Sequence, residues 1–143
     1  MPPEGGSLDY TFTVPATPAA VTAARRTVVD SLAVWGLPPG SEVVHTLRLA
    51  VSELVTNAVQ HTGHVTPHIT VTLQADARRR LRIGVTDRHR DRPRIRLATS
   101  DATRGRGLAL VRSLLLELRG HLTTQRHPDG TKTVWIHVPP AAG

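Results

Sequence analysis

The sequence contains no cysteine and few aromatic residues, and these absences narrow what the chain can be. Without cysteine there is neither a disulfide framework nor a thiolate metal site. No apolar run is long enough to cross a bilayer, and the start M-P-P-E-G-G lacks the basic-then-apolar order of a signal peptide. We therefore expect a soluble cytoplasmic protein of 143 residues, with a flexible tail at 1–7 and a single domain at 8–140.

Lysine is also scarce, and Lys132 is the only one in the sequence. Arginine supplies the other basic side chains, and the formal net charge is +7. Nine of the arginines crowd into one short region: Arg78, Arg79, Arg80, Arg82, Arg88, Arg90, Arg92, Arg94 and Arg96. Such charge suits nucleic acid, an acidic protein partner or nucleotide phosphates. The region has no interleaved aromatic residues and no DNA-reading motif, so we expect no specific nucleic-acid binding. A partner surface and a plain solvated face both stay open.

Hydrophobic periodicity sets the order of the elements. Alternating apolar residues predict strands over 8–14, 69–73, 81–85, 122–124 and 134–138. Apolar residues at three- and four-residue steps predict helices over 17–36, 41–62 and 104–120, with Thr17 and Ser41 as N-caps. The order β-α-α-β-β-α-β-β predicts an α/β two-layer sandwich, in which three helices cover one face of a mostly antiparallel mixed sheet.

The central helix carries a row of polar side chains beside its apolar face. That face consists of Leu47, Val51, Leu54 and Ala58. Glu53, Asn57 and His61 lie four residues apart and form the polar row. A solvated stripe is the ordinary interpretation, but Asn is a mediocre helix former and the row borders the core. The amide oxygen of Asn57 suits Mg²⁺, and Glu53 could take a proton from an attacking hydroxyl, which favours phosphoryl transfer.

Three further features follow in the chain. Asp87 stands at a strand end, where it is either a turn former or an acceptor for a ligand amine. Gly105 and Gly107 lie in the stretch Arg104–Gly107 that opens the predicted third helix. Backbone amides and the helix dipole could face phosphates there, or the glycines could only make a turn. Thr131-Lys132-Thr133 follows the predicted turn Pro128-Asp129-Gly130 and by itself indicates a strand start.

Taken together and in this order, these motifs resemble the ATP-binding domain (Bergerat-type fold) shared by gyrase, the heat-shock chaperone of that fold and histidine kinases. Within that superfamily the chain is most similar to the short anti-sigma-factor serine/threonine kinases of bacteria. The resemblance covers nearly the whole chain. It rests on E-L-V-T-N-A-V-Q-H at 53–61, V-T-D at 85–87, R-G-R-G-L-A-L-V at 104–111 and G-T-K-T-V-W at 130–135.

The resemblance implies a role for each matching position. It implies that Asn57 binds Mg²⁺, that Glu53 is the general base and that His61 lies in the pocket. It further implies that Asp87 accepts a hydrogen bond from the adenine amino group, with Thr133 supporting that contact. The mobile lid and the nucleotide-binding residues on it would be Gly105, Arg106, Gly107 and Leu108.

One departure from the family pattern concerns the loop after the third strand. The family has D-x-G-x-G there, whereas this chain has Asp87-Arg88-His89-Arg90-Asp91. Glycine serves where φ is positive or a ligand approaches the backbone closely, so its loss bears on adenine binding. Arg88 and Arg90 could instead contact a phosphate or a partner. Zinc binding by His61, His64 and His68 is disfavoured, since Gly63 and Pro67 keep them from sharing a helical face.

The resemblance implies an ATP- and Mg²⁺-dependent serine/threonine protein kinase of the anti-sigma regulatory type. Its substrate would be an anti-sigma-factor antagonist, a sigma factor would be a further candidate partner, and the chain would form a homodimer. No membrane partner is expected. The alternative from another class is a non-catalytic regulatory binding module of the same fold with a degenerate nucleotide site. The missing glycines favour the module, and Glu53 with Asn57 favours the kinase.

Overall fold

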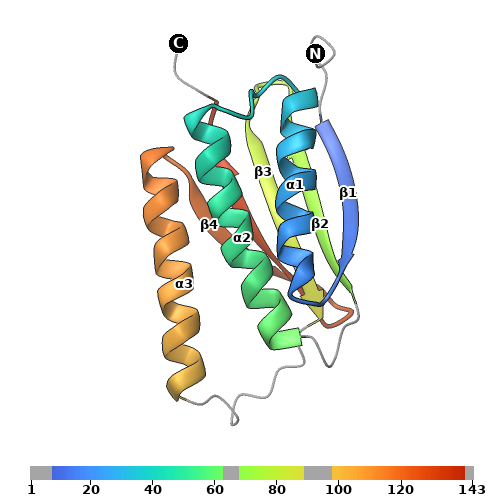
Figure 1. The fold of residues 1–143 in the computed structure, drawn as a ribbon, viewed down its shortest axis with the longest axis vertical. Coiled ribbons are helices and arrows are strands. Elements are labelled where there is room, and N and C mark those ends of the chain that lie inside the picture. Colours follow the sequence, from blue (N-terminus) through green and yellow to red (C-terminus); the bar gives the residue numbers. More distant parts are fainter. Residues whose placement is uncertain (1–7, 63–67, 89–97, 141–143) are drawn as a thin grey trace.

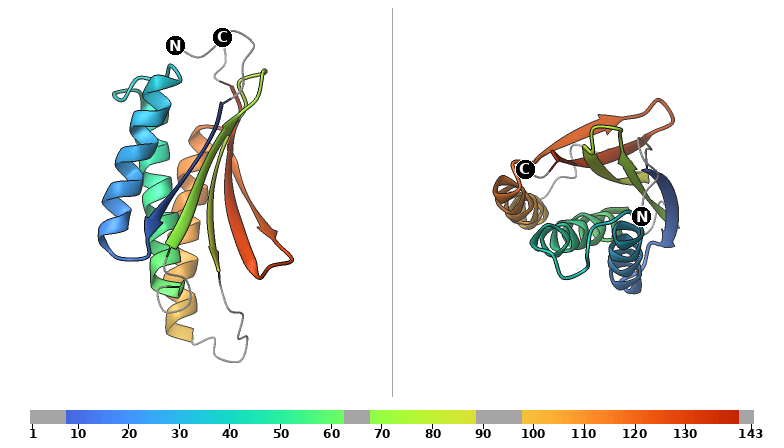
Figure 2. Two further views of the ribbon diagram at one scale, coloured as in Figure 1. Left: turned by 90° about the vertical axis from the view of Figure 1, so that its right-hand side faces the viewer. Right: turned by 90° about the horizontal axis from the view of Figure 1, so that it is seen from above.

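A single antiparallel sheet with helices on one face forms the protein. The computed structural model describes residues 8–62, 68–88 and 98–140, with only the backbone for 61, 62, 88 and 98–106. The sheet order is β1-β2-β3-β5-β4, and every neighbouring pair is antiparallel. The helices pack on one face, and no helix of the described residues covers the other face (Figures 1 and 2). The elements are β1 (Leu8–Pro15), α1 (Ala19–Val34), α2 (Glu42–Thr62), β2 (His68–Ala75), β3 (Leu81–Arg88), α3 (Ala98–Glu117), β4 (His121–Arg126) and β5 (Thr131–Val138).

This arrangement confirms the predicted α/β two-layer sandwich and its element order. The described sheet is antiparallel throughout rather than mixed. Because side chains alternate along a strand, one set of residues faces the helices and the other faces outward. Within the described residues, the inner set joins the helices in one core of buried apolar residues, which include Leu32, Leu47, Val51, Ile69, Ile83, Leu115 and Ile136.

The ends of α1 show one wrong prediction and one confirmed prediction. Pro18, not Thr17, is the N-cap, and no side-chain hydrogen bond caps the helix. Thr17 instead contributes its carbonyl oxygen, which accepts a hydrogen bond from the Ala20 amide at 2.9 Å. At the other end Gly36 has φ 106°, and the Leu37 amide donates to the Leu32 carbonyl at 2.8 Å. A glycine in this left-handed conformation is a common helix stop.

The central helix α2 begins and ends where its sequence indicates. Ser41 Oγ accepts a hydrogen bond from the Val44 amide at 3.3 Å, which is the N-cap interaction that satisfies one free amide of the first turn. The buried residues of α2 include Leu47, Val51 and Leu54. Because α2 lies between α1 and α3 over the sheet (Figure 1), its apolar face is enclosed and its polar row lies toward α3.

Helix α3 begins earlier than predicted. Its first residue is Ala98, whereas the sequence motif placed the start at Arg104. Gly105 and Gly107 therefore lie well inside the helix and not in its first turn. The residues from 98 to 104 carry no apolar periodicity, so the pattern that marks an amphipathic helix was absent there. The predicted use of these glycines at a helix N-terminus is wrong for this conformation.

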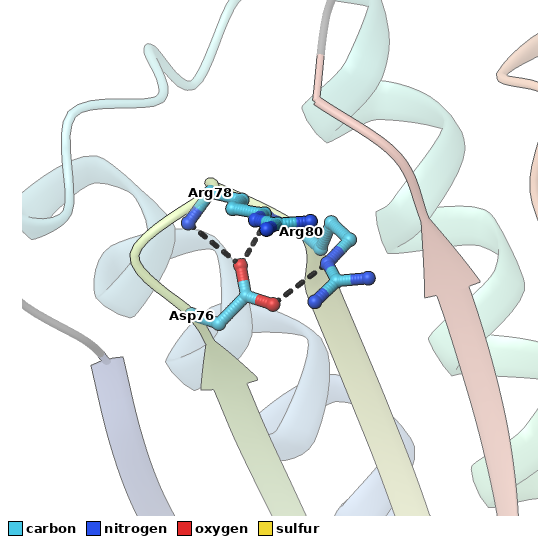
Figure 3. Close-up of polar contacts among 3 residues, drawn as sticks. All are labelled: Asp76, Arg78 and Arg80. Carbon is cyan, nitrogen blue, oxygen red and sulfur yellow. Dashed lines mark hydrogen bonds and ion pairs between the residues drawn. The ribbon is translucent and has the colours of Figure 1, made fainter.

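The turn between β2 and β3 is organised by one carboxylate (Figure 3). Asp76 Oδ1 accepts hydrogen bonds from the amides of Arg78 and Arg80, both at 3.0 Å. Its other oxygen is 2.7 Å from Arg80 Nε. The backbone hydrogen bond from Arg80 is the main factor that lowers the pKa of Asp76. Arg79 adopts φ 64°, so the turn is closed by side-chain bonding without a glycine.

Candidate functional site

The polar row of α2 lies at the edge of the core. Glu53 and Asn57 are half-buried, while Leu54 and Ala58 beside them are buried. The side chain of His61 lies outside the described part of the structure, so its expected place in the pocket stays a prediction. The helix thus holds a carboxylate and an amide one turn apart, at the boundary between apolar and open surroundings.

Helix α3 touches this row through a residue without a side chain. A Cβ placed on Gly107 would lie 3.3 Å from Glu53 Oε1 and 3.4 Å from Asn57 Oδ1. The first distance is tighter than usual and the second is ordinary van der Waals contact, so a larger residue would require these side chains or α3 to shift. Gly107 therefore allows close approach between the two helices. It brings the backbone of the predicted lid against the predicted base and metal ligand.

A cavity of about 50 Å³ lies between α2, α3 and the sheet. Asn57 and Asp87 both line it, as does Leu108 from the predicted lid. The remaining lining residues are Leu54, Ala58, Val85, Lys132 and Val134. The structure thus brings together four residues that the sequence singled out separately: Asn57, Asp87 and Leu108 at the cavity, and Glu53 beside Asn57 at Gly107.

Asp87 is the buried acid at the base of the cavity. It lies near the end of β3 on the face that packs against the helices, and its side chain is buried, with 7% of the residue exposed. Lys132 of β5 is its direct partner in the strand register and lines the same cavity. A buried carboxylate needs hydrogen bonds or an opposite charge, and the register supplies a cation next to it. The local charge of the site therefore depends on the carboxylate of Asp87 and the ammonium group of Lys132, which lie on neighbouring strands.

Thr133 lies on the opposite face of the sheet from Asp87. Its hydroxyl shares hydrogen bonds with Thr86 Oγ1 at 2.6 Å and His127 Nε2 at 2.8 Å. A Cβ on Gly84 would lie 2.8 Å from Thr133 Cγ2, which puts both residues on the outer face. The structure does not bring Thr133 to the cavity, so this geometry does not support its expected contact with adenine.

Lys132 is the site residue that the sequence motif did not single out. A signal for it existed, because Lys132 lies in phase with Val134 and Ile136, which alternate toward the core. The motif points to the threonines, whereas the alternation along the strand points to the lysine between them.

The remaining predicted site residues can be placed only in part. Gly105 and Arg106 belong to α3, and the Arg106 side chain lies outside the described residues. His64, His89, Arg90 and Asp91 also lie outside them. Within the described residues no group of three or more His, Cys, Asp or Glu side chains could hold a metal ion. Of the three histidines His61, His64 and His68, only His68 has a described side chain.

The comparison with protein families identifies the domain that surrounds this cavity as an ATPase domain of the histidine kinase type. The model of the family described as "Histidine kinase-like ATPase domain" matches residues 14–136, and the chain belongs to this family. Among curated proteins none matches the chain. None of the helices in the described part of the chain combines the length and the hydrophobicity that a bilayer crossing requires.

Solved structures share the fold at low sequence identity. The RsbU and RsbW domains of Rv1364c from Mycobacterium tuberculosis match at TM-score 0.64 and 22% identity, over 94% of this chain and 34% of that chain. The histidine kinase domain of the Erythrobacter litoralis EL346 blue-light activated histidine kinase matches at TM-score 0.52 and 21% identity, over 88% of this chain and 61% of that chain. The chain thus spans about a third of the first structure and less than two thirds of the second.

Proposed function

We propose that the protein is an ATP- and Mg²⁺-dependent serine/threonine protein kinase of the anti-sigma regulatory type. The observation that carries the proposal is the meeting of Asn57 and Asp87 at one cavity, with Glu53 one turn from Asn57. Each of these residues supplies a different part of phosphoryl transfer: a metal ligand, an adenine acceptor and a base. The family membership of the chain supports the same chemistry.

The residues present fit a magnesium–phosphate site. Asn57 offers the neutral oxygen that a hard cation accepts, and it would hold the ion. Mg²⁺, when bound, would offset negative charge on the phosphates. Glu53 Oε1 and Asn57 Oδ1 approach the same point beside Gly107, so the base and the metal ligand are neighbours. Glu53 would take the proton of an acceptor Ser or Thr hydroxyl as its oxygen bonds to the γ-phosphorus and ADP leaves.

Nucleotide binding requires the cavity to enlarge. Sites for small molecules usually measure roughly 300–1,000 Å³, against about 50 Å³ here. Gly107 and Leu108 form the α3 side of this region, so this segment would move away from α2 when ATP enters. Glycine within a helix is about 1 kcal/mol less favourable than alanine, which makes the segment easier to displace. The lid of the proposed kinase would then be the Gly105–Leu108 part of α3.

The proposed partners follow from the type of kinase. The RsbW-containing structure that shares this fold supports a place among regulatory proteins. We propose an anti-sigma-factor antagonist as the phosphate acceptor, a sigma factor as a further partner and a homodimer as the assembled form.

A non-catalytic binding module is the second candidate function. Three observations favour it: the Asp87–Asp91 stretch has no glycine, Lys132 sits opposite Asp87, and the cavity is small. A cation beside Asp87 would compete with the adenine amino group for the carboxylate. In that case the fold would hold a partner and transfer no phosphate.

Calorimetric titration with a non-hydrolysable ATP analogue, with and without Mg²⁺, tests the metal site. The parent should bind more tightly with Mg²⁺, and Asn57→Ala should lose that gain, by about tenfold or more, because a ligand to the cation is missing. Gln60→Ala removes an exposed amide from the same helix and serves as the control. Equal Mg²⁺ dependence in Asn57→Ala and the parent would exclude Asn57 from the metal site.

Single-turnover transfer from labelled ATP to a candidate antagonist decides between kinase and module. The kinase proposal expects label on a Ser or Thr of the antagonist. Nucleotide binding without transfer to any cognate antagonist would support the module, and so would the absence of nucleotide binding.

A further inference from the structure

A second, much wider cavity lies at the other end of the sheet from Asp87. It has a volume of about 620 Å³, within the range usual for small-molecule sites. Leu81 and Arg82, at the start of β3, line this cavity, whereas Asp87 at the end of the same strand lines the small one. Six residues of extended strand separate Leu81 from Asp87, about 20 Å, so the two cavities are distinct.

This large cavity has an apolar part and a cationic part. Leu8, Ala75, Leu81, Val138 and Pro139 form the apolar part. Arg80, Arg82 and Arg119 contribute guanidinium groups, while Asp9 and Asp76 contribute the carboxylates. Asp76 is already engaged by Arg80 and two backbone amides (Figure 3). The cavity therefore offers a surplus of positive charge next to an apolar wall.

Arg82 is held in a defined position. Its Nε donates a hydrogen bond to Gln74 Oε1 at 2.7 Å, and its guanidinium carbon lies 4.0 Å from the centroid of the Trp135 ring. Gly84 makes the Trp135 position possible, because a Cβ there would lie 2.7 Å from the indole ring. A guanidinium fixed in this way loses little conformational entropy when it binds a planar or tetrahedral anion.

Two histidines lie beside the arginines in this cavity. The rings of His121 on β4 and His137 on β5 stack at 4.6 Å between centroids, with an interplanar angle of 7°. Thr123 Oγ1 lies 2.8 Å from His137 Nε2. Burial lowers the pKa of His137, and the neighbouring charges of His121 and Arg82 lower it further. An anion placed among these groups would oppose that repulsion, so its binding would be accompanied by proton uptake.

We propose that this cavity binds an organic anion with an apolar chain and a carboxylate or phosphate head group. The head group would contact Arg82, Arg119 and the His121–His137 pair. The chain would lie against Leu8 and Pro139, the two apolar lining residues that are not buried in the core. The charged groups that face His137 are Arg82 on β3, His121 on β4 and, around the cavity, Arg80, Arg119, Asp9 and Asp76. The site is independent of the proposed kinase site, since no lining residue is shared.

The test follows the histidine imidazole resonances of the full chain by NMR while four probes are added. Octanoate and octyl phosphate carry both features, octanol carries only the chain, and inorganic phosphate carries only the charge. Octanoate and octyl phosphate should shift the His121 and His137 signals, raise the pKa of His137 and bind more tightly at lower pH. The stronger of the two identifies the head group, and octanol and phosphate should each bind at least about tenfold more weakly.

The matched variants are Arg119→Asn and Arg126→Gln. Arg119 has φ 60°, and asparagine tolerates this left-handed conformation, so the change removes charge without backbone strain. Arg119→Asn should weaken octyl phosphate binding by about tenfold. Arg126 is exposed on β4 and does not line the cavity, so its change should have little effect. If both variants lose affinity for octyl phosphate equally, the binding depends on overall charge and the proposal is overturned. It is also overturned if inorganic phosphate binds as tightly as octyl phosphate. Unchanged His137 signals with all four probes would overturn it as well.

Discussion

The two ends of the sheet differ in how much open space lies beside them. At the Asp87 end α3 packs on α2 through Gly107 and leaves about 50 Å³. At the Leu81 end about 620 Å³ stays open between arginines and apolar residues. The family motifs lie at the closed end, and the arginines that the sequence left without a role lie in part at the open end. The sequence motifs therefore indicate where catalysis is expected, but they do not indicate which end of the sheet has a cavity large enough for a ligand in this conformation.

The sharpest test of the closed end is Glu53→Gln, which keeps the shape and removes the basic carboxylate. If Glu53 is the base, single-turnover transfer should slow by about 10²–10⁴-fold while binding of the ATP analogue is retained. Glu42→Gln makes the same substitution at the exposed start of the same helix and should transfer at the parent rate. Equal transfer by Glu53→Gln and the parent would remove Glu53 from the chemistry.

The open end should be the more sensitive to backbone crowding. A Cβ on Gly120 would overlap the carbonyl oxygen of His137, which is backbone and cannot rotate away. Gly120→Ala should therefore lower the free energy of unfolding by about 1–3 kcal/mol, as measured by urea denaturation. Gly40→Ala is the control, since a Cβ there meets nothing within 4 Å. If the two variants are equally stable, the chain relaxes around Gly120 at little cost.

Lys132 tests whether charge, as well as space, restricts the closed end. Lys132→Met keeps the length of the side chain and removes the cation beside Asp87. If Lys132 competes with adenine for that carboxylate, affinity for the ATP analogue should rise several-fold, by about 1 kcal/mol. Arg126→Met removes a cation from the neighbouring position of β4 and should not raise it. A lower affinity in Lys132→Met would mean that Lys132 contacts the nucleotide.

The smallest effect is expected from the protonation of His137 at the open end, which should make the free energy of unfolding depend on pH. The pKa of His137 is lowered from 6.5, so the folded chain binds fewer protons there than the unfolded chain. The free energy of unfolding should consequently fall as the pH drops below 6.5 and recover above it. His137→Gln should reduce this difference between unfolding at about pH 7.5 and about pH 5.5. The lowered pKa of Asp76 acts in a more acidic window, below 3.8. An unchanged pH dependence in His137→Gln would assign the effect to other groups.

The amino-acid sequence by itself determined the order of the elements, the Ser41 cap, the Gly36 stop and the polar row on α2. These depend on local periodicity and local hydrogen bonding, which a short stretch of chain specifies. Apolar periodicity is absent before Arg104, and the predicted start of α3 was therefore wrong.

Only the tertiary structure decided which residues meet. The strand register placed Lys132 beside Asp87 and turned Thr133 to the other face, because a strand exposes alternate residues to opposite sides. The packing of α3 on α2 made Gly107 a contact residue. The cavity at Arg82 and His137 gathers residues from the ends of several strands and a turn, and no sequence spacing joins them. Such contacts depend on how distant elements pair and pack, which periodicity along the chain does not specify.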